Sequence, residues 1–297
     1  MTLQTKGIAL AIISAIAYGT NPLGALMLYR EELNVNSVIF YRFSFSVVIL
    51  AFFMFYRKID FRLNVKDFLK LLILGVLFGI SALSLFSSFL YMDSGLSSTI
   101  LFSYPILVAI LMAIFYKEKN SIITILSIVF AFLGVVFLFN SDVSNISSFG
   151  IFLVFISSIC YAIYIVIVNQ YLKMAALKVT FYSMFFCTFT IFLSSFINPS
   201  SNIIMLTNLN MWFWTLFLAI VPTIISLLFL VKAIQIIGST SASILGALEP
   251  LTALFVGIFL FNEKISITIV FGIFLILFAV FLIVLKDYLI KIFKLRV

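Results

Sequence analysis

The sequence contains no histidine, only two cysteines and few charged residues, and each shortage excludes a class of protein. Only 9% of the 297 residues are charged, whereas a soluble domain carries about 25%. So little charge cannot cover a water-soluble globule. The lack of histidine removes the commonest metal ligand and the usual proton relay. Cys160 and Cys187 both lie in apolar runs, so we expect no disulfide framework, no metal site and no cofactor.

The signatures of nucleotide hydrolysis and of hydrolytic catalysis are missing as well. The chain has no Walker A pattern, no His-Glu zinc motif and no Gly-x-Ser-x-Gly turn. The segments between its apolar runs are too short for a catalytic domain. We therefore expect no enzyme, and we expect any transport to draw its energy from a gradient.

Apolar residues make up 65% of the chain and run from end to end, with 37 Phe and 12 Tyr. This composition excludes intrinsic disorder and predicts a protein that crosses the membrane many times. A span needs about 20 mostly apolar residues. Ten runs fit, at 7–28, 36–56, 68–91, 95–116, 121–139, 149–170, 178–197, 211–236, 241–261 and 266–285.

The basic residues predict an orientation, because Lys and Arg gather in cytoplasmic loops. With ten spans both termini lie on one side. Placing them inside puts 15 of the 18 basic residues on the inner side, with Arg30 and Lys264 outside and Arg42 within the second span. The net charge of +8 is thus explained by the orientation of the protein in the membrane, and we expect no nucleic-acid partner. The predicted location is the plasma (inner) membrane of a bacterium, with both termini cytoplasmic.

The chain repeats itself. Residues 7–18 and 150–161 share seven of twelve positions at an offset of 143. Further on the offset is 145, where Pro105 matches Pro250 and Glu118 matches Glu263. Each half holds five spans, an odd number, so the second half enters the membrane inverted. Inverted repeats are typical of secondary transporters. The predicted units are 1–140, 148–288 and a basic cytoplasmic tail at 289–297.

These features together resemble the EamA branch of the drug/metabolite transporter superfamily. The resemblance covers essentially the whole chain. It is carried by ten spans in two halves, a proline in the fourth and ninth spans, and a Glu-Lys pair just after each of them. The resemblance implies an all-α membrane protein, with ten transmembrane helices in two inverted five-helix repeats around a central cavity. It also implies transport of small organic metabolites, often outward, without fixing the substrate.

Polar residues within the spans should face the bundle or water, because hydrocarbon does not satisfy them. In the first and sixth spans they recur on one helix face with equivalent spacing, which indicates either a cavity lining or hydrogen bonding between helices. These residues are Ser14, Tyr18 and Asn21, and Ser157, Tyr161 and Tyr164.

The third span presents Ser81, Ser84, Ser88 and Tyr91 on one face. The serines also suit close helix packing. Tyr91 and Tyr104 are candidates for substrate contact, since each joins an apolar ring to a hydroxyl.

Glu249 lies about eight residues into the ninth span, and an acid at that depth is a candidate functional site. Its repeat partner is Tyr104, so the charge breaks the symmetry. It is a candidate for binding a substrate amine or for taking up a proton. The alternative is a structural ion pair with Lys232.

Arg42, in the second span, either attracts an anionic group or extends to the outer surface. Glu118 and Glu263 lie at span ends beside lysines and are candidates for structural or gating roles.

Three prolines within spans are hinge candidates, because proline removes a backbone hydrogen bond. They are Pro22, Pro105 and Pro250. The run Gly19-Thr20-Asn21-Pro22 predicts a local break in the first span.

The predicted function is a secondary transporter, working by alternating access, of a small organic metabolite such as an amino acid. Export is the expected direction. The expected partners are this substrate and the lipid bilayer, and the expected state is a monomer. Two alternatives stay open: an intramembrane enzyme or lipid-modifying protein, and a structural membrane subunit that does not transport.

Overall fold

A computed structural model describes residues 2–92, 94–118, 120–138, 147–171, 173–196, 202–261 and 267–286. Every regular element in these ranges is helical. Glu263 and the predicted basic tail lie outside the described residues. The helices of the first half are α1 (Leu3–Tyr18), α2 (Asn21–Arg30), α3 (Val35–Tyr56), α4 (Val65–Ser88), α5 (Ser94–Leu101), α6 (Tyr104–Tyr116) and α7 (Ile122–Leu138).

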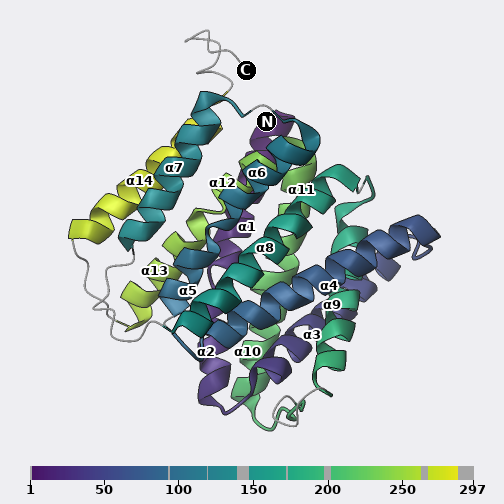
Figure 1. Cartoon of the computed structure of the whole chain (residues 1–297). Helices are drawn as coiled ribbons and strands as arrows, with labels where there is room; N and C mark the ends of the chain where they lie inside the picture. The colour runs from purple at the N-terminus through teal and green to yellow at the C-terminus, as the bar shows by residue number, and fades with distance from the viewer. Residues whose placement is uncertain are drawn as a thin grey trace.

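The second half begins with α8 (Ser148–Tyr171) and α9 (Ala176–Ser194). Its remaining elements are α10 (Leu209–Ala219), the π-helical turn η2 (Ile220–Ile225), α11 (Ser226–Ile237), α12 (Ser239–Leu245), α13 (Leu248–Phe261) and α14 (Ile267–Val284). The first residues of α1 and the last of α14 lie at the same end of the bundle (Figure 1).

Seven helical segments in the described ranges are long and apolar enough to cross a membrane, and α6, α7 and α14 are shorter apolar helices. The third predicted span, 68–91, is displaced in the structure, because α4 covers Val65–Ser88. The Asn64 side chain caps α4 by accepting a hydrogen bond from the Asp67 amide, at 2.7 Å, so the helix starts earlier than the apolar run.

Three predicted spans are interrupted near their middles. The first is broken between Tyr18 and Asn21, which confirms the break predicted there. The fourth and ninth are broken at 102–103 and 246–247. Each new helix carries a proline in its first turn, where the missing N–H costs nothing. Each break therefore leaves helix ends, with their unpaired backbone groups, inside the bundle.

The packing follows the repeat. Helix α1 packs against α11, and its counterpart α8 packs against α4, the counterpart of α10–α11. Helices α3 and α9 pack together, as do α7 and α14, which lie beside the rest of the bundle (Figure 1). These pairs are what a twofold relation between the two halves requires.

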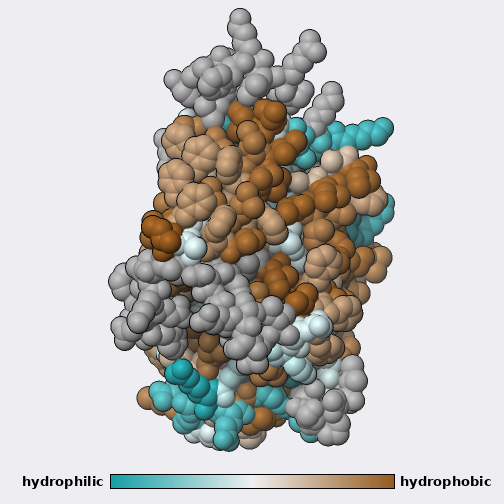
Figure 2. All heavy atoms as spheres, turned by 60° about the vertical axis from the view of Figure 1, so that its left-hand side comes forward, coloured by the Kyte–Doolittle hydropathy of each residue, from teal (hydrophilic) through white to brown (hydrophobic). Residues whose placement is uncertain are grey.

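The outer surface is apolar over most of its area. Large exposed side chains include Phe52, Phe55, Phe274 and Phe281. Figure 2 shows one face as a broad hydrophobic area, with hydrophilic side chains gathered at the lower end and the upper right. Such a surface is suited to lipid rather than water. The chain is an integral membrane protein.

Candidate functional site

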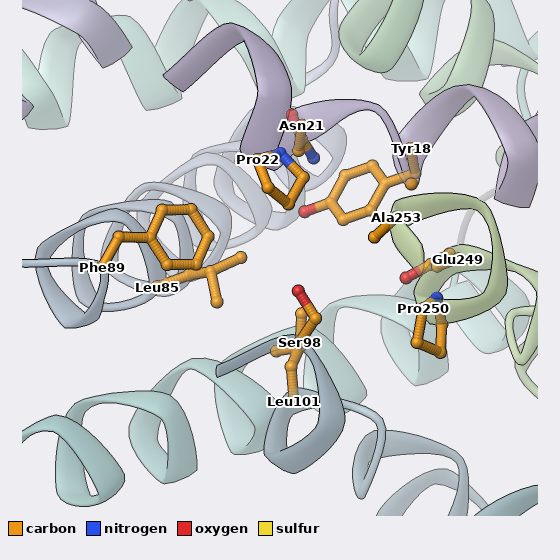
Figure 3. Close-up of a pocket in the computed structure, with 11 residues that line it drawn as sticks. Tyr18, Asn21, Pro22, Leu85, Phe89, Ser98, Leu101, Glu249, Pro250 and Ala253 are labelled. Carbon is orange, nitrogen blue, oxygen red and sulfur yellow. The ribbon is translucent and has the colours of Figure 1, made fainter. Parts of the chain in front are cut away.

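A small pocket lies where the broken helices meet, between the break in the first span and the start of α13 (Figure 3). The end of α4 and the helix α5 complete its wall. The volume that water-sized molecules can reach inside it is about 20 Å³, enough for one or two waters and too small for a metabolite. The lining residues are Tyr18, Gly19, Asn21, Pro22, Leu85, Phe89, Ser98, Leu101, Glu249, Pro250 and Ala253.

Gly19 brings two helix breaks into contact. A Cβ atom there would lie 2.4 Å from the Glu249 carbonyl oxygen and 2.6 Å from Thr252 Cβ. The backbone angles of Gly19, φ −61° and ψ −12°, are open to any residue. The glycine is therefore required by space and not by conformation, and it fixes the start of α13 against the end of α1.

Glu249 is 8% exposed, and its Oε1 accepts a hydrogen bond from the Tyr104 hydroxyl at 3.3 Å. The two residues are repeat partners, so the pair sits where the halves meet. Tyr104 reaches this position across the break at Gly246, where a Cβ would lie 1.8 Å from the tyrosine oxygen. Among the described residues no ion pair joins Glu249 to Lys232, and Lys232 is exposed. The alternative of a Glu249–Lys232 ion pair is therefore wrong.

Three polar groups point into the pocket from three helices. Figure 3 shows the Tyr18 hydroxyl, the Ser98 hydroxyl and the Glu249 carboxylate directed toward the same space. Asn21 also lines the pocket and is only 2% exposed. Neither its amide oxygen nor its amide nitrogen has a hydrogen-bond partner among the described residues. A buried amide without partners is costly, so Asn21 is a candidate for contact with a bound molecule or ion.

Four tyrosines predicted to line a cavity form one aromatic cluster beneath the pocket. The ring of Tyr161 lies 5.9 Å from Tyr18, 4.8 Å from Tyr104 and 6.2 Å from Tyr164. All four side chains are buried, and only Tyr18 also lines the pocket. Through Tyr18 the cluster packs directly against the pocket.

The predicted serine stripes lie between helices. Ser81 and Ser157 are joined by a contact of 2.9 Å between their hydroxyls, and each also donates to the other's carbonyl oxygen. Ser14 donates to the Ser226 carbonyl at 2.8 Å in the equivalent contact of the other half. Ser84 is buried on α4 away from the pocket lining.

Tyr91 is likewise remote from the pocket. It is 47% exposed, and its ring lies 5.1 Å from that of Phe149.

Arg42 does not reach the surface, so the prediction of an outward-extending side chain is wrong. It is 1% exposed. Its Nε donates to Thr223 Oγ1 at 2.5 Å and its Nη2 to the Pro222 carbonyl at 3.2 Å. Pro222 lacks an N–H and lies in the π-helical turn η2, where backbone carbonyls lose their usual partners. Arg42 supplies hydrogen bonds to this turn and joins it to α3.

Glu118 lies at the end of the bundle where α1 begins. Its carboxylate accepts a hydrogen bond from Thr240 Oγ1, at 3.3 Å. Nearby, Asn169 donates to Ser239 Oγ at 3.1 Å, and Tyr116 donates to the Tyr171 hydroxyl at 3.0 Å. These contacts join α6, α8 and α12 and close that end.

Several lining residues could not be selected from the sequence alone. Ser98 and Phe89 are unremarkable in a chain rich in serine and phenylalanine, and only the fold brings them together with Glu249. Pro22 and Pro250 line the pocket, whereas Pro105 lies at the start of α6, outside the lining.

Comparisons with known proteins agree on the fold and the family. A model of the EamA-like transporter family matches residues 5–140 and 148–285. An uncharacterized transporter of Archaeoglobus fulgidus is 38% identical over 105 residues, which are 35% of this chain and 37% of that relative. The match thus spans just over a third of the curated relative. A solved crystal structure superposes with a TM-score of 0.77 at 14% identity, covering 94% of this chain and 96% of that one.

Proposed function

The chain belongs to the EamA-like transporter family and is a membrane transporter, and we propose that it carries a small organic metabolite by alternating access. The observation that supports this most is the pocket at the meeting point of the three broken helices. Broken helices expose backbone groups to a substrate at the middle of the membrane, as in other secondary transporters. In this proposal the ten predicted spans form two inverted five-helix repeats, with both termini cytoplasmic.

The pocket favours an amphipathic substrate with an amino group, such as an amino acid. Glu249 and the Ser98 hydroxyl offer acceptors for an ammonium group, and Asn21 offers an unpaired amide. Leu85, Phe89 and Leu101 offer apolar contact. Since the present space holds only one or two waters, the substrate enters through movement of the helices around the breaks.

Two features support a carrier over a channel or a membrane enzyme. In this proposal the tyrosine cluster and the hydrogen bonds between α6, α8 and α12 close the path from the pocket to one end of the bundle. A site closed on one side is what alternating access requires. The pocket also presents one acid, without the clustered acids or cysteines that an intramembrane hydrolase would use.

We propose a functional monomer that exports its substrate. One chain encloses the whole pocket, so no second copy is needed to complete the site.

Flux through reconstituted vesicles tests the proposal. Purified protein is reconstituted, and vesicles are loaded with radiolabelled amino acids, amines and other small metabolites in turn. We expect saturable flux for an amine-bearing metabolite and its loss in Glu249→Gln. Asp67→Asn is the matched control, since Asp67 pairs with Lys70 near the start of α4, outside the pocket, and its replacement should leave substrate affinity unchanged. Folded protein without flux for any metabolite class, or full flux in Glu249→Gln, contradicts the proposal.

A further inference from the structure

The oxygens around the pocket are arranged as acceptors. The Ser98 hydroxyl already donates to the Ser94 carbonyl at 2.8 Å, so its lone pairs are left for the pocket it lines. Thr20, beside the pocket, likewise donates to the Ala17 carbonyl at 2.7 Å. The Glu249 carboxylate has only acceptor atoms. These oxygens suit a ligand that donates hydrogen bonds or carries positive charge, and the Asn21 amide nitrogen is an unpaired donor beside them.

Helix α1 adds to the negative potential of the pocket. It ends at Tyr18, where the carbonyl end of the helix carries a partial negative charge, and the Ala15 and Ala17 carbonyls accept the amides of Gly19 and Thr20. The ends of interrupted helices provide such carbonyls as ligands for coupling ions in secondary transporters. No basic side chain lines the pocket, and Arg42 is engaged by Thr223 and Pro222. The carboxylate therefore has no basic side chain beside it in the lining, and only the N-terminal turns of α2 and α13 offer it partial positive charge.

Asn21 points independently to a ligand at this place. Its side chain is 2% exposed and lines the pocket, and its amide oxygen lacks a hydrogen-bond partner among the described residues. A buried polar atom of this kind is normally satisfied by a ligand, an ion or a water.

The size of the pocket limits the ligand to a small particle. The reachable volume of about 20 Å³ holds one ion or one or two waters. The carboxylate and neutral oxygens are hard ligands, which suit alkali and alkaline-earth cations. With one carboxylate, a monovalent cation leaves the buried site neutral, whereas a divalent cation leaves an excess charge that is costly at low dielectric.

We propose that this pocket binds one sodium ion through Glu249, Ser98, Tyr18 and the Asn21 carbonyl, and that the ammonium group of the substrate displaces it. The inference rests on the proposed function, because it concerns the same pocket. The carboxylate pairs with one cation at a time, so sodium and substrate exclude each other. A carrier that moves only when Glu249 is neutralised then exchanges sodium for an amine-bearing metabolite, and an inward sodium gradient drives export.

Binding of radioactive sodium to the purified full-length protein tests the site directly. At constant ionic strength, set with choline chloride, we expect saturable binding of one sodium ion per chain. Potassium at the same concentration should compete poorly. Glu249→Gln should abolish binding, and Ser98→Ala should weaken it by roughly tenfold, the equivalent of about 1.4 kcal/mol.

Ser97→Ala is the matched control for Ser98→Ala. Ser97 lies on the same helix and is buried, but it accepts a hydrogen bond from Ser88 at 3.0 Å and does not line the pocket. It should bind sodium as the wild type does. Undiminished binding in folded Glu249→Gln, or no sodium binding above the potassium background in folded wild type, overturns the proposal.

A flux measurement separates this proposal from the proposed function. Saturable metabolite flux that is equally fast in sodium-free choline medium refutes the sodium site and supports the proposed transport function. Sodium binding without flux for any metabolite supports the ion site and refutes the proposed transport function. Competition between sodium and substrate on the same side of the membrane supports both.

Discussion

Replacing Gly19 by alanine tests whether the contact between two helix breaks shapes the pocket. The new methyl group would lie 2.4 Å from the Glu249 carbonyl oxygen and 2.6 Å from Thr252 Cβ. Neither atom can rotate away, because one belongs to the backbone and the other is fixed to it. Overpacking costs about 1–3 kcal/mol, and a clash with backbone belongs at the upper end, about 2–3 kcal/mol. Relief requires α13 to move away from the end of α1, which displaces Glu249.

The assay for Gly19→Ala is denaturant unfolding in detergent micelles, combined with metabolite flux in vesicles. We expect a lower free energy of unfolding and a lower affinity for substrate. Gly79→Ala is the matched control, since the nearest atoms to a methyl group there are side-chain atoms, of Thr190 at 3.2 Å and of Cys187 at 3.6 Å. In the middle of α4 the same change also gains up to about 1 kcal/mol of helix propensity. Wild-type stability and flux in Gly19→Ala, or a larger loss in Gly79→Ala, would refute the reasoning.

Two further predictions concern the scaffold around the site. Arg42→Ala leaves the Pro222 carbonyl and Thr223 without their charged donor and should lower the free energy of unfolding by about 3 kcal/mol. Arg42→Lys should recover little of it, since one ammonium group cannot replace the forked guanidinium; full recovery would contradict this account. In a double-mutant cycle of unfolding free energies, Ser81→Ala and Ser157→Ala should show a coupling energy of about 0.6 kcal/mol. Additive effects of the two substitutions would mean that the hydrogen bonds between these serines do not stabilise the fold.

The helical class and the approximate positions of the spans followed from the sequence, because apolar length and charge distribution are local properties of the chain. The break at Gly19-Thr20-Asn21-Pro22 was also predictable, since glycine and proline act through their own backbone. The breaks at 102–103 and 246–247 were harder to predict. Pro105 and Pro250 indicated kinks, whereas the structure places each in the first turn of a new helix.

The roles of the polar side chains depend on the partner helix, which one sequence does not specify. Spacing alone put Ser14 and Tyr18 on one face, yet Ser14 bonds to Ser226 while Tyr18 lines the pocket. Arg42 was misplaced for the same reason, because the π-helical turn that binds it lies about 180 residues further along the chain. The choice of Glu249 as a site candidate stays a prediction, and its place in the pocket supports it.

The repeat also indicates what the opposite conformation exposes. If the two halves exchange conformations, a pocket forms in the other half. It is then lined by the residues that correspond, in the repeat, to those that line the present pocket. At an offset of 143 the partners of Tyr18 and Asn21 are Tyr161 and Tyr164. At an offset of 145 the partner of Ser98 is Ser243, which donates to the Thr240 carbonyl at 2.9 Å, much as Ser98 donates to Ser94.

The second pocket would thus be lined by tyrosines and a serine acceptor, without an acid of its own. Tyr104 takes the place of Glu249 there, and the two residues already share a hydrogen bond. One carboxylate at the boundary between the halves can therefore face both pockets in turn. In the proposed mechanism a cation bound to this carboxylate follows the opening of the tyrosine cluster, and one acid then serves both halves of the repeat.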